Sequence, residues 1–412
     1  MSSLPTLSAP SLGDSDSADL SESLRAHRAS FGHHFGTEDG VRTFFSPGRV
    51  NLFGGHLDYN GGPVLPTAID RGTFVAIRPR QDGEIRMASR FAEVQGSFKA
   101  AELPVSPRGE WFDYPLGVLL ALIRLEDSMA AKLAGGFDVL FGGNLPVGAG
   151  LSSSASICVG TTFALDALLG LGLDPVQRVE AALDAERGFV GVKCGIMDPY
   201  AVGFARPKHV LWLDCKDETF EHLPMDFERL SIGVVDTGIQ RLLARGEFNR
   251  RVTECAAAFE ALRIHAPEAR VLRDISREVL TENGHELDSD LLRRATHVVE
   301  EVERTFVARE ALLSGDLKTL GRCMTETHFS LRDRYDCSCE ELDVLVEAAT
   351  QKGGALGARL TGAGFGGCAV MLIAAGDEER VSEAVVSDFE RRYGRRPPIA
   401  FFQGDEGPRE IH

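Results

Sequence analysis

The chain carries apolar stretches of two kinds, some with helical spacing and others as short runs between glycines and prolines. In SESLRAHRASFGHHFG, the residues Leu24, Phe31 and Phe35 fall on one side of a helix. Short apolar runs with glycine or proline at their ends predict strands instead. These runs are RTFFSPGRVNLF (42–53), GPVLPTAID (62–70), GTFVAIRPR (72–80), FDVLF (137–141) and SIGVVDT (231–237).

Helical patterns dominate the middle of the chain. One follows the loop GGNLPVGAG, from 153 to about 171, and another extends from 248 to about 320. Near the end, ARLTGAGFGGCAVMLIA (358–374) predicts a strand, a glycine turn and a second strand. Because strands and helices do not alternate regularly, the order favours an α+β fold over a doubly wound parallel sheet. We expect two domains, 21–205 and 206–412.

Composition narrows the class of protein. The 412 residues are 43% hydrophobic and 25% charged, which is ordinary for a globular protein, and the formal net charge is −17. Acidic residues are spread along the chain, so we expect no nucleic-acid partner and no membrane surface, although a local pocket could still bind an anionic small ligand. No stretch approaches about 18 consecutive apolar residues, so we expect no membrane span and a cytoplasmic protein.

The N-terminus and the cysteines add two expectations. Residues 1–20 are rich in Ser, Pro and Asp and lack both a basic start and an apolar run, which predicts a disordered tail. The eight cysteines include no C-x-x-C pair. We therefore expect reduced, mostly buried thiols rather than a zinc site.

Two glycine-rich segments and one aspartate could carry chemistry. In LPVGAGLSSSASICVG (145–160), three serines stand where a helix begins, and free N–H groups there favour an anion. No Lys follows as in Walker A, and a plain turn with an N-cap serine is the alternative. The second segment, LTGAGFGGCAVML (360–372), is by itself more typical of a hairpin. Asp198 stands among apolar residues in CGIMDPYA, so it is either functional or a paired structural Asp.

Taken together, these segments resemble a known family. GRVNLFGGHLDYNGG (48–62), LPVGAGLSSSAS, CGIMDPY and GARLTGAGFGGC occur in an order that resembles the galactokinases of the GHMP kinase superfamily. EFNRRVTEC (247–255) and HFSLRDRYDCSCEELDVLVEAA (328–349) match as well. The resemblance implies a two-domain GHMP kinase fold with the active site in the inter-domain cleft. It also implies transfer of the ATP γ-phosphoryl group to the anomeric hydroxyl of a sugar.

The resemblance further implies which residues form the site. Asp198 would face the sugar O1 as base or orienter, with Arg49 stabilising that carboxylate and the transferring charge. Ser154 and Glu186 would hold Mg²⁺, and the loop 362–367 would close the other side of the cleft. Such groups suit phosphoryl transfer, which depends on positioning and charge neutralisation. The implied ATP contacts are Pro146, Gly148, Ala149, Gly150, Leu151, Ser152, Ser153, Ser154, Ala155 and Ser156. The implied sugar contacts are Gly55, His56, Asp58, Gly195, Arg241 and Phe248.

Three of these positions depart from the galactokinase pattern. Gly55 stands where GEHTDYN has a Glu that accepts hydrogen bonds near the C6 hydroxyl, so the acceptor and its charge are lost and we expect space there. Phe248 replaces a sugar-facing Tyr, and Arg241 stands near the position of a His. One explanation is drift, with galactose still bound through water or a neighbouring side chain.

The other explanation is a sugar altered at C6. Galacturonate would be accepted beside Gly55 and an Arg fork. For a 6-deoxy sugar, removal of the Glu avoids a buried unpaired group that costs about 1–3 kcal/mol. The sequence does not choose between these sugars.

The alternative to an enzyme is a non-catalytic sensor. Some galactokinase relatives bind ATP and galactose without catalysis, and loss of residues from the Ser/Ala loop would indicate such a protein. Here GLSSSAS is complete, and Arg49, Glu186 and Asp198 are present, which favours a kinase. We expect ATP and a monosaccharide as ligands, and a monomer or weak homodimer.

Overall fold

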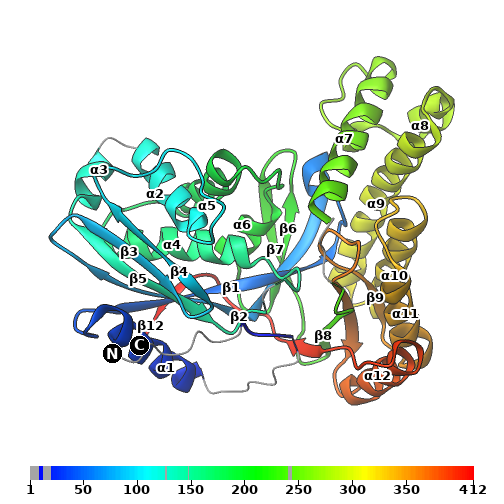
Figure 1. Ribbon diagram of the computed structural model, residues 1–412. Coiled ribbons are helices and arrows are strands. Elements are labelled where there is room, and N and C mark those ends of the chain that lie inside the picture. The colour runs from blue at the N-terminus through cyan, green and yellow to red at the C-terminus, as the bar shows by residue number, and fades with distance from the viewer. Residues whose placement is uncertain (1–8, 13–19, 126–127, 147, 240–243) are drawn as a thin grey trace.

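The structure is a computed structural model that describes residues 9–12, 20–125, 128–146, 148–239 and 244–412. It contains two sheets, each with its own helices (Figure 1). The larger sheet lies at the left of Figure 1, and the smaller sheet lies at the right beside a group of long helices.

The larger sheet has eight strands in the order β12-β1-β2-β5-β3-β4, and the β6–β7 hairpin is joined to β2. All neighbouring strands are antiparallel except β3 and β5, which are parallel. Its strands are β1 (Arg42–Phe53), β2 (Pro63–Pro79), β3 (Glu84–Ser89), β4 (Ala92–Lys99), β5 (Gly136–Gly143), β6 (His209–Asp214), β7 (Thr219–Pro224) and β12 (Arg409–Ile411).

Helices cover both faces of this sheet. One face carries α2 (Asp113–Leu125), α3 (Ser128–Leu133), α4 (Ser153–Leu169), α5 (Pro175–Asp184) and α6 (Met197–Gly203) (Figure 1). On the other face α1 (Leu20–Phe35) packs against β2 and β5, and its Phe31 is fully buried. The α1 pattern predicted from Leu24, Phe31 and Phe35 thus marks the side that meets the sheet.

The smaller sheet has the order β11-β8-β10-β9. Its strands are β8 (Leu230–Asp236), β9 (Gly357–Leu360), β10 (Cys368–Ala374) and β11 (Ile399–Phe402). The accompanying helices are α7 (Ala244–Leu262), α8 (Arg277–Asn283), α9 (Ser289–Ser314), α10 (Leu317–Asp333), α11 (Glu340–Glu347) and α12 (Glu378–Tyr393). One apolar core contains side chains of β1, β8, β10, α9 and α10, so it joins the two sheets.

Most predicted elements are confirmed. The runs 42–53, 137–141 and 231–237 form β1, β5 and β8, and the predicted hairpin forms β9 and β10. The runs 62–70 and 72–80, predicted as two strands, form the single strand β2, whose pairing with β1 shifts register near Gly72. A side chain at Gly72 would overlap the backbone of Ser46, so glycine lets the two strands run closely together there.

The predicted boundary at residue 205 stays a prediction. The β6–β7 hairpin after it still belongs to the larger sheet, and the smaller sheet begins with β8, while β12 returns to pair with β1. Most of the predicted tail 1–20 lies outside the described residues, but Leu12 is described and is buried in the core that joins the sheets. Within the described ranges, every helix is too short or too polar to cross a bilayer.

Candidate active site

Two cavities meet where the larger sheet faces the smaller one. The smaller cavity, of about 280 Å³, is formed by the end of β1, the start of α6, and residues of α7, α10 and β9. The larger cavity, of about 610 Å³, lies at the N-terminus of α4 and the end of β8. Both are lined by Arg49, Asp198, Gly362 and Ala363, so a molecule in one cavity can reach a molecule in the other at these residues.

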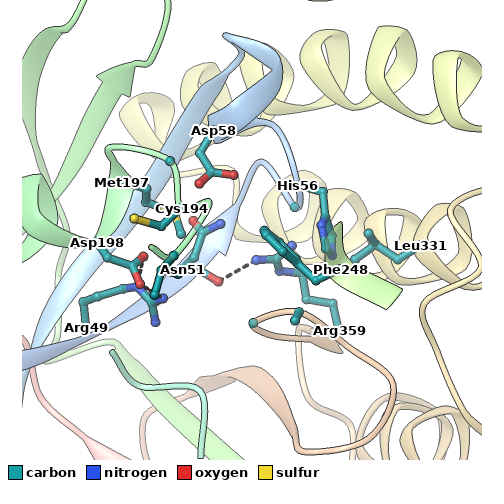
Figure 2. A pocket seen from close by; sticks show the side chains of 15 residues that line it. Arg49, Asn51, His56, Asp58, Cys194, Met197, Asp198, Phe248, Leu331 and Arg359 are labelled. Atoms are coloured by element: carbon teal, nitrogen blue, oxygen red, sulfur yellow. Dashed lines mark hydrogen bonds and ion pairs between the residues drawn. The ribbon is translucent and has the colours of Figure 1, made fainter. Parts of the chain in front are cut away.

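Arg49 and Asp198 line both cavities. Their side chains pair with each other (Figure 2). The guanidinium of Arg49 donates from Nε to Oδ1 of Asp198 at 2.7 Å and from Nη2 to Oδ2 at 2.6 Å. Its Nη1 donates to the carbonyl of Gly150 at 2.7 Å, and the hydroxyl of Ser152 also donates to Asp198. The Arg49 side chain is buried, whereas 27% of the Asp198 side chain is exposed, so the carboxylate stays accessible to a ligand.

The start of α4 is suited to an anion. Gly148, Gly150 and the residues 151–154 line the larger cavity, and the first N–H groups of a helix have no partners within it. Ser152, just before the helix, has a φ of 59°, a left-handed conformation that is uncommon for serine. This turn lets its hydroxyl reach Asp198 while the residues after it enter the helix.

Ser156, one of the predicted ATP contacts, does not line the larger cavity, and its hydroxyl points to the sheet. That hydroxyl donates to the carbonyl of Ser46 and to Oγ1 of Thr73, both at 2.8 Å, because a helix turns by about 100° per residue and carries Ser156 to the sheet side. Three other predicted ATP contacts also lie outside the wall of the larger cavity, namely Pro146, Ala149 and Ala155.

Ser154 and Glu186 lie together beside the larger cavity. Glu186 belongs to a π-helical turn, Ala185–Val190, that continues α5, and such turns are frequent at functional sites. Burial raises the pKa of its carboxyl to about 7, while the hydrogen bond from Ser154 and the nearby Arg49 oppose the shift. Its Oε2 is buried and has no partner among the described residues. A hydroxyl beside a carboxylate oxygen that lacks a partner fits a hard divalent cation such as Mg²⁺.

Asp58 and Gly195 form one wall of the smaller cavity. Asp58 starts the short helix Asp58–Asn60, and burial together with the charge of Asp198 raises its pKa to about 6. A side chain at Gly195 would overlap Oδ2 of Asp58, so glycine is needed there for the carboxylate to lie against the backbone. The structure thus brings both predicted sugar contacts to one wall.

His56 and Phe248 lie on the opposite wall (Figure 2). His56 has a φ of 60°, and its Nδ1 shares a hydrogen bond of 2.8 Å with the hydroxyl of Tyr59. Burial, with the neighbouring His297 and Arg359, lowers the pKa of His56 to about 3, so the ring is neutral. Phe248 packs against this ring, with 5.9 Å between the ring centroids.

The expected space at Gly55 does not exist. A Cβ at this glycine would lie 2.6 Å from Nη1 of Arg359 and 3.1 Å from Cδ1 of Leu331. The position that carries a Glu in the galactokinase pattern is therefore filled by the end of a buried arginine and by a leucine from α10. Arg241, the arginine predicted near this end of the sugar, lies outside the described residues.

Sequence reasoning missed several residues of the two cavities. Arg359 is the most consequential, and it stands within the GARLTGAGFGGC segment, directly before the glycine loop. Arg359 belongs to β9, but the sequence around it does not predict that its side chain reaches Gly55. Other lining residues not singled out are Asn51, Val192, Cys194, Met197 and Leu331 in the smaller cavity and Asp236, Gly238 and Ile239 in the larger one.

Models of known families match three parts of the chain. The galactokinase galactose-binding signature matches residues 29–79, the GHMP kinases N-terminal domain matches 114–206, and the GHMP kinases C-terminal domain matches 308–391. The first contains Arg49 to Asp58, and the second contains the α4 loop, Glu186 and Asp198.

Comparison with relatives over their whole length agrees with the family models. The chain is 40% identical to galactokinase of Fusobacterium nucleatum over 81% of its length and 85% of that protein. It is 39% identical to galactokinase of Roseiflexus over 92% of its length and 95% of that protein.

Solved structures give the same result. Lactococcus lactis galactokinase, solved in complex with galactose, matches with a TM-score of 0.88 and 33% identity over 94% of this chain and 100% of that one. Mevalonate kinase of Methanococcus jannaschii shares only the fold, with a TM-score of 0.64 and 19% identity over 89% of this chain and 98% of that one. The chain therefore belongs to the galactokinase family of the GHMP kinases, has their α+β fold, and is an ATP-dependent sugar kinase.

Proposed function

We propose that this kinase phosphorylates the anomeric hydroxyl of galactose or of a close C6-modified relative such as galacturonate. The observation that carries the proposal is the Arg49–Asp198 ion pair, because it lines both cavities at once. The smaller cavity has a volume of about 280 Å³. That is below the range of roughly 300–1,000 Å³ for drug-sized ligands and suits a monosaccharide. The relatives named galactokinase support a sugar of the galactose type.

In the proposed reaction the sugar O1 lies against Asp198. The O1–H proton passes to the carboxylate, a bond forms between O1 and the γ-phosphorus, and the bond from that phosphorus to the bridging oxygen breaks as ADP leaves. Arg49 keeps Asp198 oriented through two hydrogen bonds and places positive charge beside the transferring group. The residues 148–154 would bind the phosphates through the N-terminus of α4.

Ser154 and Glu186 would hold Mg²⁺ at this end of the larger cavity. Bound there, the ion would neutralise phosphate charge, and the buried Oε2 of Glu186 supplies an oxygen that has no partner among the described residues. Asp58, His56 and the backbone at Gly195 would contact sugar hydroxyls, since they line the smaller cavity with Asp198.

An ADP-release assay with galactose, galacturonate and 6-deoxygalactose tests the proposal, with the product identified as a sugar 1-phosphate by ³¹P NMR. We expect phosphorylation at O1 of at least one of these sugars. ATP binding without turnover on all three would contradict the proposal and would indicate a sensor. Phosphate on another oxygen would contradict the placement of O1 at Asp198.

A further inference from the structure

A buried arginine in the smaller cavity, Arg359, forms no ion pair with any of the residues that the structure describes. Arg359 is only 1% exposed, and Nη2 donates to the carbonyl of Asn51 at 2.6 Å (Figure 2). Its Nε is buried without a hydrogen-bond partner, and among the described residues no carboxylate forms an ion pair with this side chain. Burial lowers the pKa of Arg359 to about 10, so the guanidinium is charged at neutral pH. A buried charge without a partner is costly unless something bound there compensates for it.

The carboxylate whose charge acts on Arg359, that of Glu301 in α9, already has other partners. Its Oε1 accepts from the backbone N–H groups of Gly54 and Gly55 at 3.3 and 3.2 Å, and both oxygens accept from Thr327 at 3.0 Å. Its Oε2 also pairs with Arg304. Glu301 raises the pKa of Arg359 through space, and Arg304, which pairs with Glu301, also lies within 4 Å of Glu300 and Glu326. Within the described part of the chain, Arg359 itself has no ion pair, and its Nε has no hydrogen-bond partner.

The surroundings would make an ion pair with Arg359 strong. Phe248 and Leu331 line the same wall with apolar surface, and His56 is neutral. A charge-assisted hydrogen bond gains strength where apolar side chains exclude water. Arg251, the other arginine that lowers the pKa of His56, already pairs with Glu254 and Asp336.

Gly55 makes this arrangement possible. Any side chain there would meet Nη1 of Arg359, so a glutamate would both displace the guanidinium and pair with it. With glycine, the guanidinium lies against the backbone and its charge is left for a ligand. In Figure 2, Arg359 lies on the side of the cavity away from Arg49 and Asp198, where the end of the sugar opposite to O1 would lie.

We propose that Arg359 binds a carboxylate at C6 of the sugar, and that the substrate class is therefore a hexuronate rather than a neutral hexose. This inference rests on the proposed function, because it places O1 at Asp198. The 6-deoxy alternative is disfavoured, since a methyl group beside Arg359 would leave its charge uncompensated. A neutral 6-hydroxyl could accept a hydrogen bond but would not neutralise the charge.

The test compares kcat/KM for galacturonate, galactose and 6-deoxygalactose in the wild type, together with calorimetric binding of each sugar without ATP. We expect galacturonate to be preferred over galactose by about ten- to a hundredfold, the range of one hydrogen bond to a charged group. A preference for galactose or 6-deoxygalactose would overturn the inference while leaving the proposed function intact. Phosphorylation of none of the three would overturn both.

Variants show whether Arg359 is responsible. Arg359→Gln should lower the ratio of galacturonate to galactose by about tenfold or more, in binding as in kcat/KM. Arg322→Gln, which removes the same charge from the exposed face of α10, is the matched control and should leave the ratio unchanged. If Arg359→Gln does not fold, Gly55→Glu provides the second test, because its carboxylate would take the place of the ligand's. An unchanged ratio in the variant that folds would overturn the role of Arg359.

Discussion

The two ends of the smaller cavity differ in whether their charged side chains are paired. At one end, Arg49 and Asp198 satisfy each other through two hydrogen bonds, with Ser152 and the Gly150 carbonyl as further partners. At the other end, Arg359 has one backbone partner and a buried Nε with none in the described part of the chain. One end is balanced before a substrate arrives, and the other is not.

Under the proposed function, the Arg49–Asp198 end would carry out phosphoryl transfer and the Arg359 end would select the sugar. A balanced ion pair is preorganised, so the reacting oxygen meets groups that need not move. Where an arginine has no anionic partner, the free energy of ligand binding depends on whether the ligand brings a negative charge or a hydrogen-bond acceptor. We therefore expect changes at Asp198 to reduce turnover for every sugar, and changes near Gly55 to alter the ratio between sugars.

The largest effect is expected for Asp198→Asn. The amide keeps the shape but cannot take the O1 proton, so kcat should fall by about 10²–10⁴ for all sugars. Calorimetry should show that ATP binding is kept, because the phosphate loop is unchanged. A kcat within a few-fold of the wild type would exclude Asp198 from the chemistry.

The second prediction concerns the cation. Ser154→Ala and Glu186→Gln should each raise the Mg²⁺ concentration for half-maximal rate by about tenfold, because a hard cation loses an oxygen ligand or its charge. Ser156→Ala is a matched control, since its hydroxyl contacts Ser46 and Thr73 rather than the cavity. Mg²⁺ titrations that coincide for the wild type and both test variants would contradict the assignment.

The sequence predicted the end of the smaller cavity at Arg49 and Asp198 better than the end at Gly55 and Arg359, which we call the selective end. The resemblance to galactokinases implied Arg49, Ser154, Glu186 and Asp198 as one group, and the structure brings these four residues close together. The motif did not reveal that the Ser156 hydroxyl faces the sheet rather than the larger cavity, because a helix presents successive residues on different sides.

At the selective end, the local pattern could not reveal the arrangement. Gly55 suggested an empty space, yet the space is filled from β9, whose side-chain direction depends on how the two sheets pack. The fold shows the same limit, because contacts between segments far apart in the sequence leave no local pattern. Local apolar runs predicted β1, β8 and the β9–β10 hairpin, whereas the return of β12 to β1 has no local signal.

The third prediction uses the pKa of Asp58, which burial and Asp198 raise to about 6. Above this pH the group is a carboxylate that accepts from sugar hydroxyls, and below it the group is protonated. Affinity for the preferred sugar should therefore fall as pH decreases from 7 to 5, by up to about tenfold per unit below the pKa. Calorimetry without Mg²⁺ and ATP measures this affinity. His56, with a pKa of about 3, stays neutral throughout, and Glu186, with a pKa of about 7, titrates in the same pH range, so the assignment to Asp58 depends on the Asp58→Asn variant.

Asp58→Asn provides the control for this pH dependence. The variant should bind more weakly at pH 7 and show little change in affinity between pH 5 and 7. A pH dependence equal to that of the wild type would assign the titration to another group.

The smallest effect is expected for Phe248→Tyr, which sharpens the comparison at the selective end. The ring packs against His56 and Tyr59, so a hydroxyl added there would enter the smaller cavity without changing its charge. We expect a shift of about two- to tenfold in favour of galactose over galacturonate, the range of one neutral hydrogen bond.

Combined with Gly55→Glu, the Phe248→Tyr change tests whether the two positions act on one end of the sugar. Neighbouring sites of this kind couple by about 0.5–3 kcal/mol, so the double variant should depart from the product of the two single effects. Additive effects would show that Phe248 and Gly55 act separately, and an unchanged ratio in Phe248→Tyr would confine sugar selection to Arg359 and its immediate contacts.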